Sequence, residues 1–340
     1  MQLDHILASL GYDQSANYLQ GKALEADRDF GHVFRKAQEK CNLHGAYVLN
    51  GAKFDKSRGS VPTVFVCQAN TEQEAREIHR KVWNQNAVPF LLVISTGWVR
   101  LYPAFQYERD VTGQPLAGAL RVLDDFRNVA SQLGPIQASE IDNGGVWRVL
   151  GRSVTPDSRV DWELLDNLNA LDRWLERDGV TDRRLAHAMI GKFVYLQYLR
   201  QRDILSDNRL IRWGIDPALV FGQNAKMVTF IELVHHVDEW LNGSVFPLSQ
   251  QKIREFGAER LRKVASVFHG EDALSGQLPL FDVYDFSFIP IETLSVIYEQ
   301  FLHAIINPSG TSEGRTRGAY YTPVPLVNYM LDRLDTRQPL

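Results

Sequence analysis

The strongest constraint on the fold lies in the first third of the chain, where two unbroken apolar runs flank one amphipathic helix. Residues 61–69 and 89–94 are rich in β-branched and aromatic side chains, as in short strands that are buried on both faces. Between them, residues 71–86 have the spacing of an amphipathic helix, and Thr71 with Glu74 has the spacing of a capping box. This order of elements predicts an α/β domain around a central sheet.

Two further strands are expected beside these runs. Residues 45–49 and 98–102 are short apolar stretches that each lie next to a turn signal containing glycine. A helical pattern returns over residues 116–133. We therefore expect an α/β domain with a mixed sheet over residues 1–135, with the element order strand, strand, helix, strand, strand.

The chain becomes mainly helical after a linker marked by glycine, proline and asparagine around 134–145. Residues 161–177 carry an apolar stripe at the helical period, and residues 181–205 are apolar nearly all round at their centre, which is typical of a core helix. We predict a helical connector domain over residues 136–305, with further helices at 224–242 and 248–267.

The composition excludes several classes of protein. Of 340 residues, 44% are hydrophobic and 23% charged, which is ordinary for globular domains. The net charge of −4 argues against a histone-like binder of nucleic acid but allows a local basic face. Neither a long apolar run nor a basic N-terminal signal occurs, so we expect a cytoplasmic protein without a membrane partner. Cys41 and Cys67 lack metal-ligand spacing and are expected to be reduced thiols.

The C-terminal region holds a pattern that suits a small anionic ligand. An amphipathic helix is expected over 291–302, and a polar stretch over 307–317 leads into Gly318-Ala319-Tyr320-Tyr321-Thr322-Pro323. Thr322 and Pro323 fit an N-cap and the first helical position, and helix N-termini favour carboxylates and phosphates. The two tyrosines can supply an aromatic wall and hydroxyl donors. On local physics alone, a capped helix whose tyrosines only pack explains the same residues.

IYEQFL, a basic polar spacer, GAYYTP and an apolar helix together resemble the entrance to the catalytic domain of adenine-N6 DNA methyltransferases. The similarity is to the large restriction-modification and phage-defence enzymes that fuse a nuclease-like region, a helical region and a methyltransferase. It implies S-adenosylmethionine as the cofactor, and residues 306–340 as the start of a truncated, Rossmann-like methyltransferase domain. The positions that it places in the cofactor pocket are Gly318, Ala319, Tyr320, Tyr321, Thr322 and Pro323.

Two motifs that adenine-N6 transfer requires do not occur in this sequence. One is a glycine-rich cofactor turn, and the other is an Asn/Asp-Pro-Pro-aromatic loop that stacks a flipped base. The resemblance therefore implies the N-terminal part of a longer enzyme, or a subunit that a second chain completes, and no catalytic residue is assigned here. Expected partners are DNA, the rest of the methyltransferase or a second subunit, and other defence-system proteins.

The first domain resembles the PD-(D/E)xK nucleases in the order of its elements. Those enzymes need an upstream acid, and then an acid and a lysine two residues apart on one strand face, around a divalent metal. On the expected strand the matching positions are Gln68 and Asn70, and Asp55 is the candidate upstream acid. Amides supply neither the charge nor the base, so we expect a nuclease-like domain without nuclease activity. An unrelated α/β domain with the same strand order is the alternative.

Five basic side chains near residues 248–267 are candidates for contacts to DNA phosphates: Lys252, Arg254, Arg260, Arg262 and Lys263. A solvated helix face, on which they pair with Glu255 and Glu259, is the simpler structural explanation. His235 and His236 invite a metal, but adjacent helical positions point about 100° apart, so we expect none there. Two other functions remain open: a divergent metal-dependent nuclease and a protein-interaction module of a defence complex.

Overall fold

The computed structural model describes residues 2–50, 59–107, 118–124, 126–155, 158–268 and 283–304, together with Thr322, Leu326, Val327 and Met330. The chain divides into two compact units. We call the unit that holds the described residues up to Trp162 the sheet unit, and the unit that holds Glu163 to Ala304 the helical unit. Each is described by itself.

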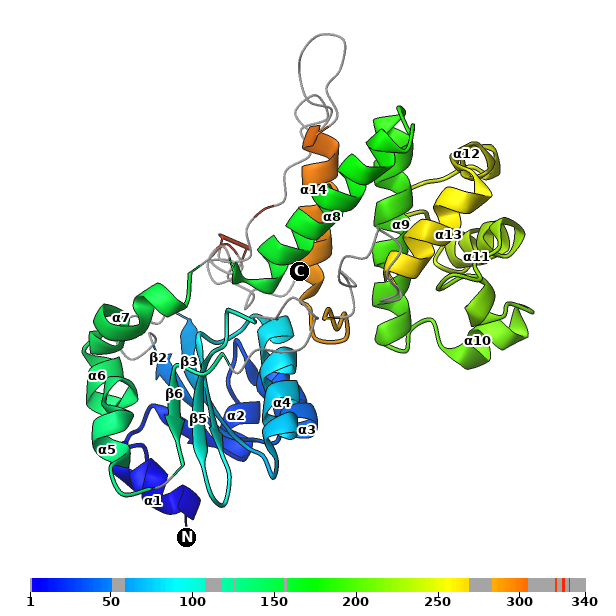
Figure 1. The fold of residues 1–340 in the computed structure, drawn as a ribbon. Coiled ribbons are helices and arrows are strands. Elements are labelled where there is room, and N and C mark those ends of the chain that lie inside the picture. The colour runs from blue at the N-terminus through cyan, green and yellow to red at the C-terminus, as the bar shows by residue number, and fades with distance from the viewer. Residues whose placement is uncertain are drawn as a thin grey trace. The chain divides into compact units, whose positions relative to one another are not determined.

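The sheet unit is built on one mixed sheet (Figure 1). This sheet has six strands, which lie in chain order. The one parallel pair of this sheet is β3 with β4, in which Val64 lies opposite Phe90 and Gln68 opposite Ile94. The other neighbouring pairs are antiparallel. The strands are β1 (Tyr18–Gln20), β2 (Leu43–Asn50), β3 (Ser60–Gln68), β4 (Phe90–Ile94), β5 (Val99–Pro103) and β6 (Arg121–Leu123).

Helices cover both faces of this sheet (Figure 1). One face buries Val64, Val66 and Leu92 in a cluster with apolar residues of α1, α5, α6 and α7. On the other face, Phe34 of α3 meets Phe65 of β3 edge to face at 5.8 Å. The helices of the sheet unit are α1 (Gln2–Ser9), α2 (Lys22–Glu25), α3 (Gly31–Cys41), α4 (Glu72–Gln85), α5 (Val129–Gln132), α6 (Ala138–Asp142) and α7 (Gly145–Leu150).

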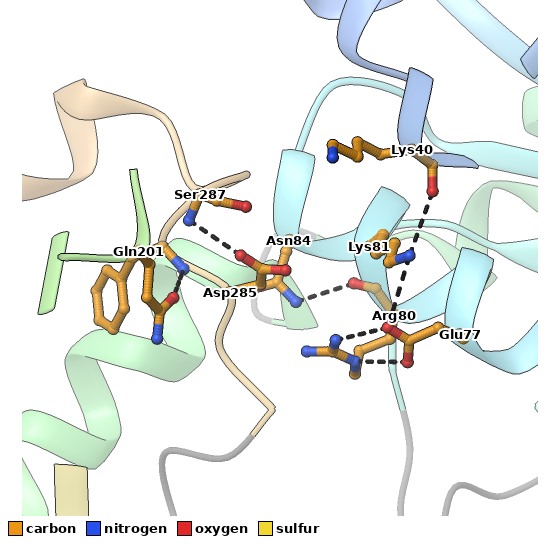
Figure 2. Close-up of polar contacts among 9 residues, drawn as sticks. Lys40, Glu77, Arg80, Lys81, Asn84, Gln201, Asp285 and Ser287 are labelled. Carbon is orange, nitrogen blue, oxygen red and sulfur yellow. Dashed lines mark hydrogen bonds and ion pairs between the residues drawn. The ribbon is translucent and has the colours of Figure 1, made fainter. Parts of the chain in front are cut away.

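Helix α4 is the crossover between the two parallel strands, and its start was predicted. The Thr71 side chain accepts a hydrogen bond from Glu74 N at 3.1 Å, as a capping box requires. In a full capping box the Glu74 side chain would accept a hydrogen bond from the backbone N–H of Thr71. Here it accepts one from the preceding residue instead, at Asn70 N, over 2.7 Å. On the side of α4 near α3, Lys81 Nζ donates to the Lys40 carbonyl oxygen at 3.3 Å, which joins the two helices (Figure 2).

The predicted strands at 45–49, 61–69, 89–94 and 98–102 are confirmed as β2, β3, β4 and β5. The helix predicted over 116–133 is wrong in part, because 121–123 form the edge strand β6 and the helix α5 begins only at Val129. Edge pairing explains this, since Arg121 lies opposite Leu101 of β5 and gains a strand neighbour. Short strands of this kind carry too few residues to show a periodicity.

The predicted boundary at residue 135 does not coincide with the boundary between the two units. Ile136, Ile141, Val146 and Leu150 belong to the same buried cluster as the core strands. The short helices after Gly134 therefore cover the sheet instead of opening a connector. Their apolar side chains make this favourable, because each fully buried aliphatic side chain stabilises the fold by about 1.5–3 kcal/mol.

The helical unit contains only helices among its described regular elements: α8 (Val160–Arg177, which begins in the sheet unit), α9 (Arg183–Gln201), α10 (Asp207–Arg212), α11 (Met227–Trp240), α12 (Gln250–Phe256), α13 (Ala258–Phe268) and α14 (Ile291–Ala304), besides one short 3-10 turn. The helices predicted at 161–177, 181–205, 224–242 and 291–302 are confirmed. The one predicted over 248–267 is broken at Gly257, whose φ of 94° is not helical. None of the described helices combines the length and the apolar content that a membrane crossing requires.

Helix α9 is the core of this unit, as its all-round apolar sequence predicted. It nevertheless carries Lys192, whose side chain is fully buried. Lys192 Nζ donates to Asp238 Oδ1 of α11 at 3.0 Å and to Ser244 Oγ at 3.3 Å. Burial lowers the pKa of Lys192, and the Asp238 carboxylate opposes that shift. A paired charge can remain in a core where an isolated one is very unfavourable.

Candidate functional site

An open cavity of about 780 Å³ lies at the carboxyl end of β3 in the sheet unit. The last turn of α3, the start of β2 and the ends of β1 and β3 meet there, because β2 runs antiparallel to β3 and places Leu43 opposite Cys67. Gln68 and Asn70, which the sequence singled out as degenerate nuclease positions, both line this cavity. The complete lining is Gln20, Gly21, Gln38, Asn42, Leu43, His44, Gln68, Ala69 and Asn70.

Glu74 at the start of α4 holds two of the lining amides in place. Its carboxylate accepts from Asn42 Nδ2 at 2.9 Å and from Asn70 Nδ2 at 3.2 Å. Asn42 is itself fixed as the left-handed C-cap of α3, with a φ of 50°. Glu74 in the first turn of α4 therefore also orients the amides on one side of the cavity.

The lining side chains carry no formal charge at neutral pH. They are amides, an imidazole and small or apolar groups. Burial lowers the pKa of the His44 imidazole from its ordinary value, while Asp4 opposes that effect. The lowered pKa favours the neutral imidazole near pH 7, and the lining side chains offer hydrogen-bond donors and acceptors but no formal charge.

This chemistry differs from that of a metal-dependent nuclease. Gln68 and Asn70 are the residues that the sequence pattern matches to an acid and a lysine, and neither amide can hold a divalent cation by charge. Asp55 lies outside the described residues. The residue next to Gln68 is Asn42, which directly precedes the neighbouring strand β2. Gln68 N donates to the Asn42 carbonyl oxygen at 3.2 Å.

Within the described ranges, no three histidine, cysteine, aspartate or glutamate side chains gather as a metal site would require. This includes the pair on α11. His236 stacks on Trp213 with ring centroids 5.1 Å apart, whereas His235 lies 4.0 Å from Glu239. The two imidazole rings lie 6.0 Å apart between centroids.

Three of the five basic candidates on α12 and α13 form ion pairs within the helical unit. Lys252 pairs with Asp182 at 3.1 Å and Glu255 at 3.0 Å. Arg260 pairs with Asp178 at 2.8 Å. Lys263 pairs with Glu259 at 3.2 Å and lies over the ring of Trp174.

Glu255 and Glu259 therefore form ion pairs with basic residues of this face, as expected. Asp178 after the end of α8 and Asp182 at the start of α9 form further ion pairs with it. Arg254 and Arg262 are the remaining two candidates. Both are exposed, and neither has an ion-pair partner in the part of the chain that the structure describes. Contacts to DNA phosphates stay a prediction for this face.

The motif assigned to the methyltransferase pocket is mostly beyond the described residues. Gly318, Ala319, Tyr320, Tyr321 and Pro323 lie outside them, and Thr322 is an exposed residue. The helix that precedes the motif, α14, is described. Its Phe301 stacks on His187 of α9 with ring centroids 4.6 Å apart, and His187 Nε2 lies 3.2 Å from Asp172 Oδ2 of α8.

The segment before α14 is anchored to the end of α9. Gln201 Oε1 accepts from Phe286 N at 2.7 Å, and Ser287 N donates to Asp285 Oδ1 at 3.0 Å (Figure 2). Arg202 donates to the carbonyl oxygens of Phe286 and Ile289 at 3.1 and 2.7 Å. Through these bonds, the aromatic-acidic stretch ahead of α14 has a fixed place in the helical unit.

The sequence did not single out four of the polar residues that line the cavity: Gln20, Gln38, Asn42 and His44. A weak signal was present, because Gln38 lies in the last turn of α3 and Asn42 directly follows that helix as its C-cap. Gln20 and His44 come from the ends of strands that only the pairing of β1 with β2 brings together.

Comparisons with protein-family models, with curated protein sequences and with solved structures returned no match for this chain.

Proposed function

We propose that this chain is the N-terminal part of an adenine-N6 DNA methyltransferase of a restriction-modification or phage-defence system. In this role the chain contacts DNA without cutting it, through the sheet unit and through the exposed basic residues of α12 and α13. The helical unit carries the chain to the start of the methyltransferase domain, and the segment 318–323 forms one wall of the S-adenosylmethionine pocket. The remaining walls come from the rest of the enzyme or from a second subunit.

The neutral cavity at the end of β3 is the observation that supports the non-cleaving role. A nuclease of this topology needs acids and a lysine there, and the described lining consists of amides, an imidazole and small or apolar groups. The element order of the sheet unit agrees with a nuclease-like fold, since two antiparallel strands, a crossover helix and a parallel strand follow one another.

The segment ahead of the cofactor motif supports the methyltransferase role. Residues 283–290 and α14 are held against α9 by the bonds of Gln201 and Arg202 and by the stack of Phe301 on His187. Helix α14 precedes the motif in the chain, as the resemblance requires, and residues 305–317 connect the two. The resemblance of the motif itself carries the choice of cofactor.

Photochemical cross-linking of radiolabelled S-adenosylmethionine to this chain together with the rest of the enzyme or the second subunit, which supply the other walls of the pocket, tests the cofactor assignment. Trypsin cleaves after Arg317 and Arg333, so the motif lies in one peptide, 318–333. We expect the label in that peptide, with loss of label in Tyr321→Ala and retention in Tyr298→Ala, a matched tyrosine of α14. Label elsewhere, or equal label in both variants, would contradict the assignment.

Binding of duplex DNA by the full chain tests the other half of the proposal. Contacts to phosphates give an affinity that falls with salt concentration. We expect such a dependence, with a smaller slope in a variant that carries Arg254→Ala and Arg262→Ala. If the chain does not bind duplex DNA even at low salt, that result would contradict a DNA-contacting role and favour a protein-interaction module.

A further inference from the structure

The cavity at the end of β3 carries hydrogen-bonding groups that the fold itself does not use. The side chains of Gln38 and Gln68 make no hydrogen bond within the part of the chain that the structure describes. Asn42 and Asn70 give their Nδ2 groups to Glu74, which leaves their Oδ1 atoms as acceptors. Polar groups arranged in this way are suited to a ligand with both donors and acceptors.

The size and the charge of the cavity restrict the class of that ligand. A volume of about 780 Å³ is in the range of small-molecule sites. The lining side chains carry no formal charge, and the nearby Glu74 carboxylate accepts hydrogen bonds from Asn42 and Asn70, so the lining itself offers hydrogen bonds and no charged ligand for a metal ion. A flat, neutral group with several polar edge atoms fits these conditions, and a nucleobase is such a group.

Basic residues stand beside this neutral cavity. Lys22 directly follows the lining residue Gly21, and Arg35 lies one turn before Gln38 on the same face of α3. Both are exposed, and among the described residues neither has an ion-pair partner. Unpaired cations of this kind are the usual contacts of a nucleic-acid backbone.

We propose that the cavity receives a single unpaired base of DNA while Lys22 and Arg35 contact the phosphates on either side of it. This inference rests on the proposed contact with DNA. Adenine is the preferred base, because a carboxamide forms a two-bond pair with the N6 and N7 atoms of adenine. The cost of leaving the stack is least for a base that is already unpaired, so the site selects bulged or single-stranded positions.

Three labelled duplexes test the proposal with the full chain: one with a single bulged adenine, one with an abasic site at the same bulge, and one fully paired. We expect the adenine bulge to bind about tenfold more tightly than the abasic bulge, the lower end of what one paired base edge contributes. The double variant Gln38→Leu with Gln68→Leu should lose this preference and keep its affinity for the paired duplex. Gln132→Leu, an exposed amide of α5, is the matched control and should keep both.

The basic residues give a second readout. Lys22→Ala and Arg35→Ala should weaken binding to all three duplexes alike and lower the salt slope by about one unit each. Equal affinity for the adenine and abasic bulges, in a chain that binds the paired duplex, would overturn the base site and leave the proposed function intact. No binding to any of the three would overturn both.

Discussion

The core of the helical unit and the cavity at the end of β3 in the sheet unit use their polar side chains in opposite ways. In the helical unit the charges face one another: Lys192 meets Asp238 in the core, and Asp172 pairs with Arg183 and His187. In the sheet unit the polar residues at the end of β3 are neutral, line an open cavity and leave amide groups without partners among the described residues. The helical unit thus uses polarity to fix its own packing, whereas the end of the sheet keeps it free for a ligand.

This difference separates residues that stabilise the fold from residues that are candidates for binding. A change in a buried pair should reduce stability, because the remaining partner loses its compensation. A change in the cavity should alter binding with little effect on folding, since surface substitutions usually shift stability by less than about 0.5 kcal/mol. The following variants test that contrast, from the largest expected effect to the smallest.

Asp238→Ala should have the largest effect. It leaves the buried ammonium of Lys192 with Ser244 as its remaining neighbour, and breaking a buried pair in this way typically costs about 3–5 kcal/mol. Urea unfolding at pH 7.5 measures the loss. Lys192→Met, which removes the charge and keeps the volume, should cost less. Equal losses of unfolding free energy in the two variants would show that the uncompensated charge of Lys192 is not the cause of the destabilisation.

In the sheet unit, the charge state of buried His79 should also affect stability, and this residue lies on α4, away from the cavity lining. Burial lowers the pKa of His79 to about 4, and its Nε2 lies 2.9 Å from the Pro103 carbonyl oxygen. The unfolded chain takes up this proton near pH 6.5, so the contribution of His79 is complete above that pH and is lost as the pH falls toward 4. The full loss is about 3 kcal/mol. Urea unfolding between pH 7.5 and 4.5, compared with His79→Leu, checks it, and an identical pH dependence in the variant would refute it.

Gly191→Ala should have an intermediate effect on the helical unit. A methyl group at this position of α9 would overlap the ring of Phe246, which is buried. Overpacking of this kind costs about 1–3 kcal/mol. Gly97→Ala in the sheet unit is the control, because nothing lies near the added methyl group. Thermal melting of the two variants should differ, and a Gly191→Ala protein that melts with the wild type would mean that the Phe246 loop moves freely.

The smallest effect on stability is expected for Gln68→Leu and Asn70→Ala at the cavity. Both side chains are exposed, so the free energy of unfolding should change by less than about 0.5 kcal/mol. Urea unfolding beside the Asp238→Ala protein makes the comparison direct. A loss of more than about 2 kcal/mol would place these residues among those that hold the fold.

The sequence predicted the elements whose signal is local. Continuous apolar runs located β3 and β4, and Thr71 located the start of α4, because burial on both faces and helix capping each act within a few residues. The sequence did not predict β1 and β6, which have three residues each and exist through their pairing with neighbours. Likewise, Gln68 and Asn70 were found from one strand, but Gln38 and His44 join them only when α3 and β2 are in place.

The central claim is that the end of β3 serves DNA contact without metal-dependent cleavage. Incubation of the full chain with supercoiled plasmid DNA in Mg²⁺ or Mn²⁺ tests it most directly. We predict that the plasmid stays supercoiled and that its retention by the protein is the same with EDTA as with either metal. Nicked or linear plasmid that disappears with EDTA and in Asp55→Asn or Asn70→Ala would contradict the claim.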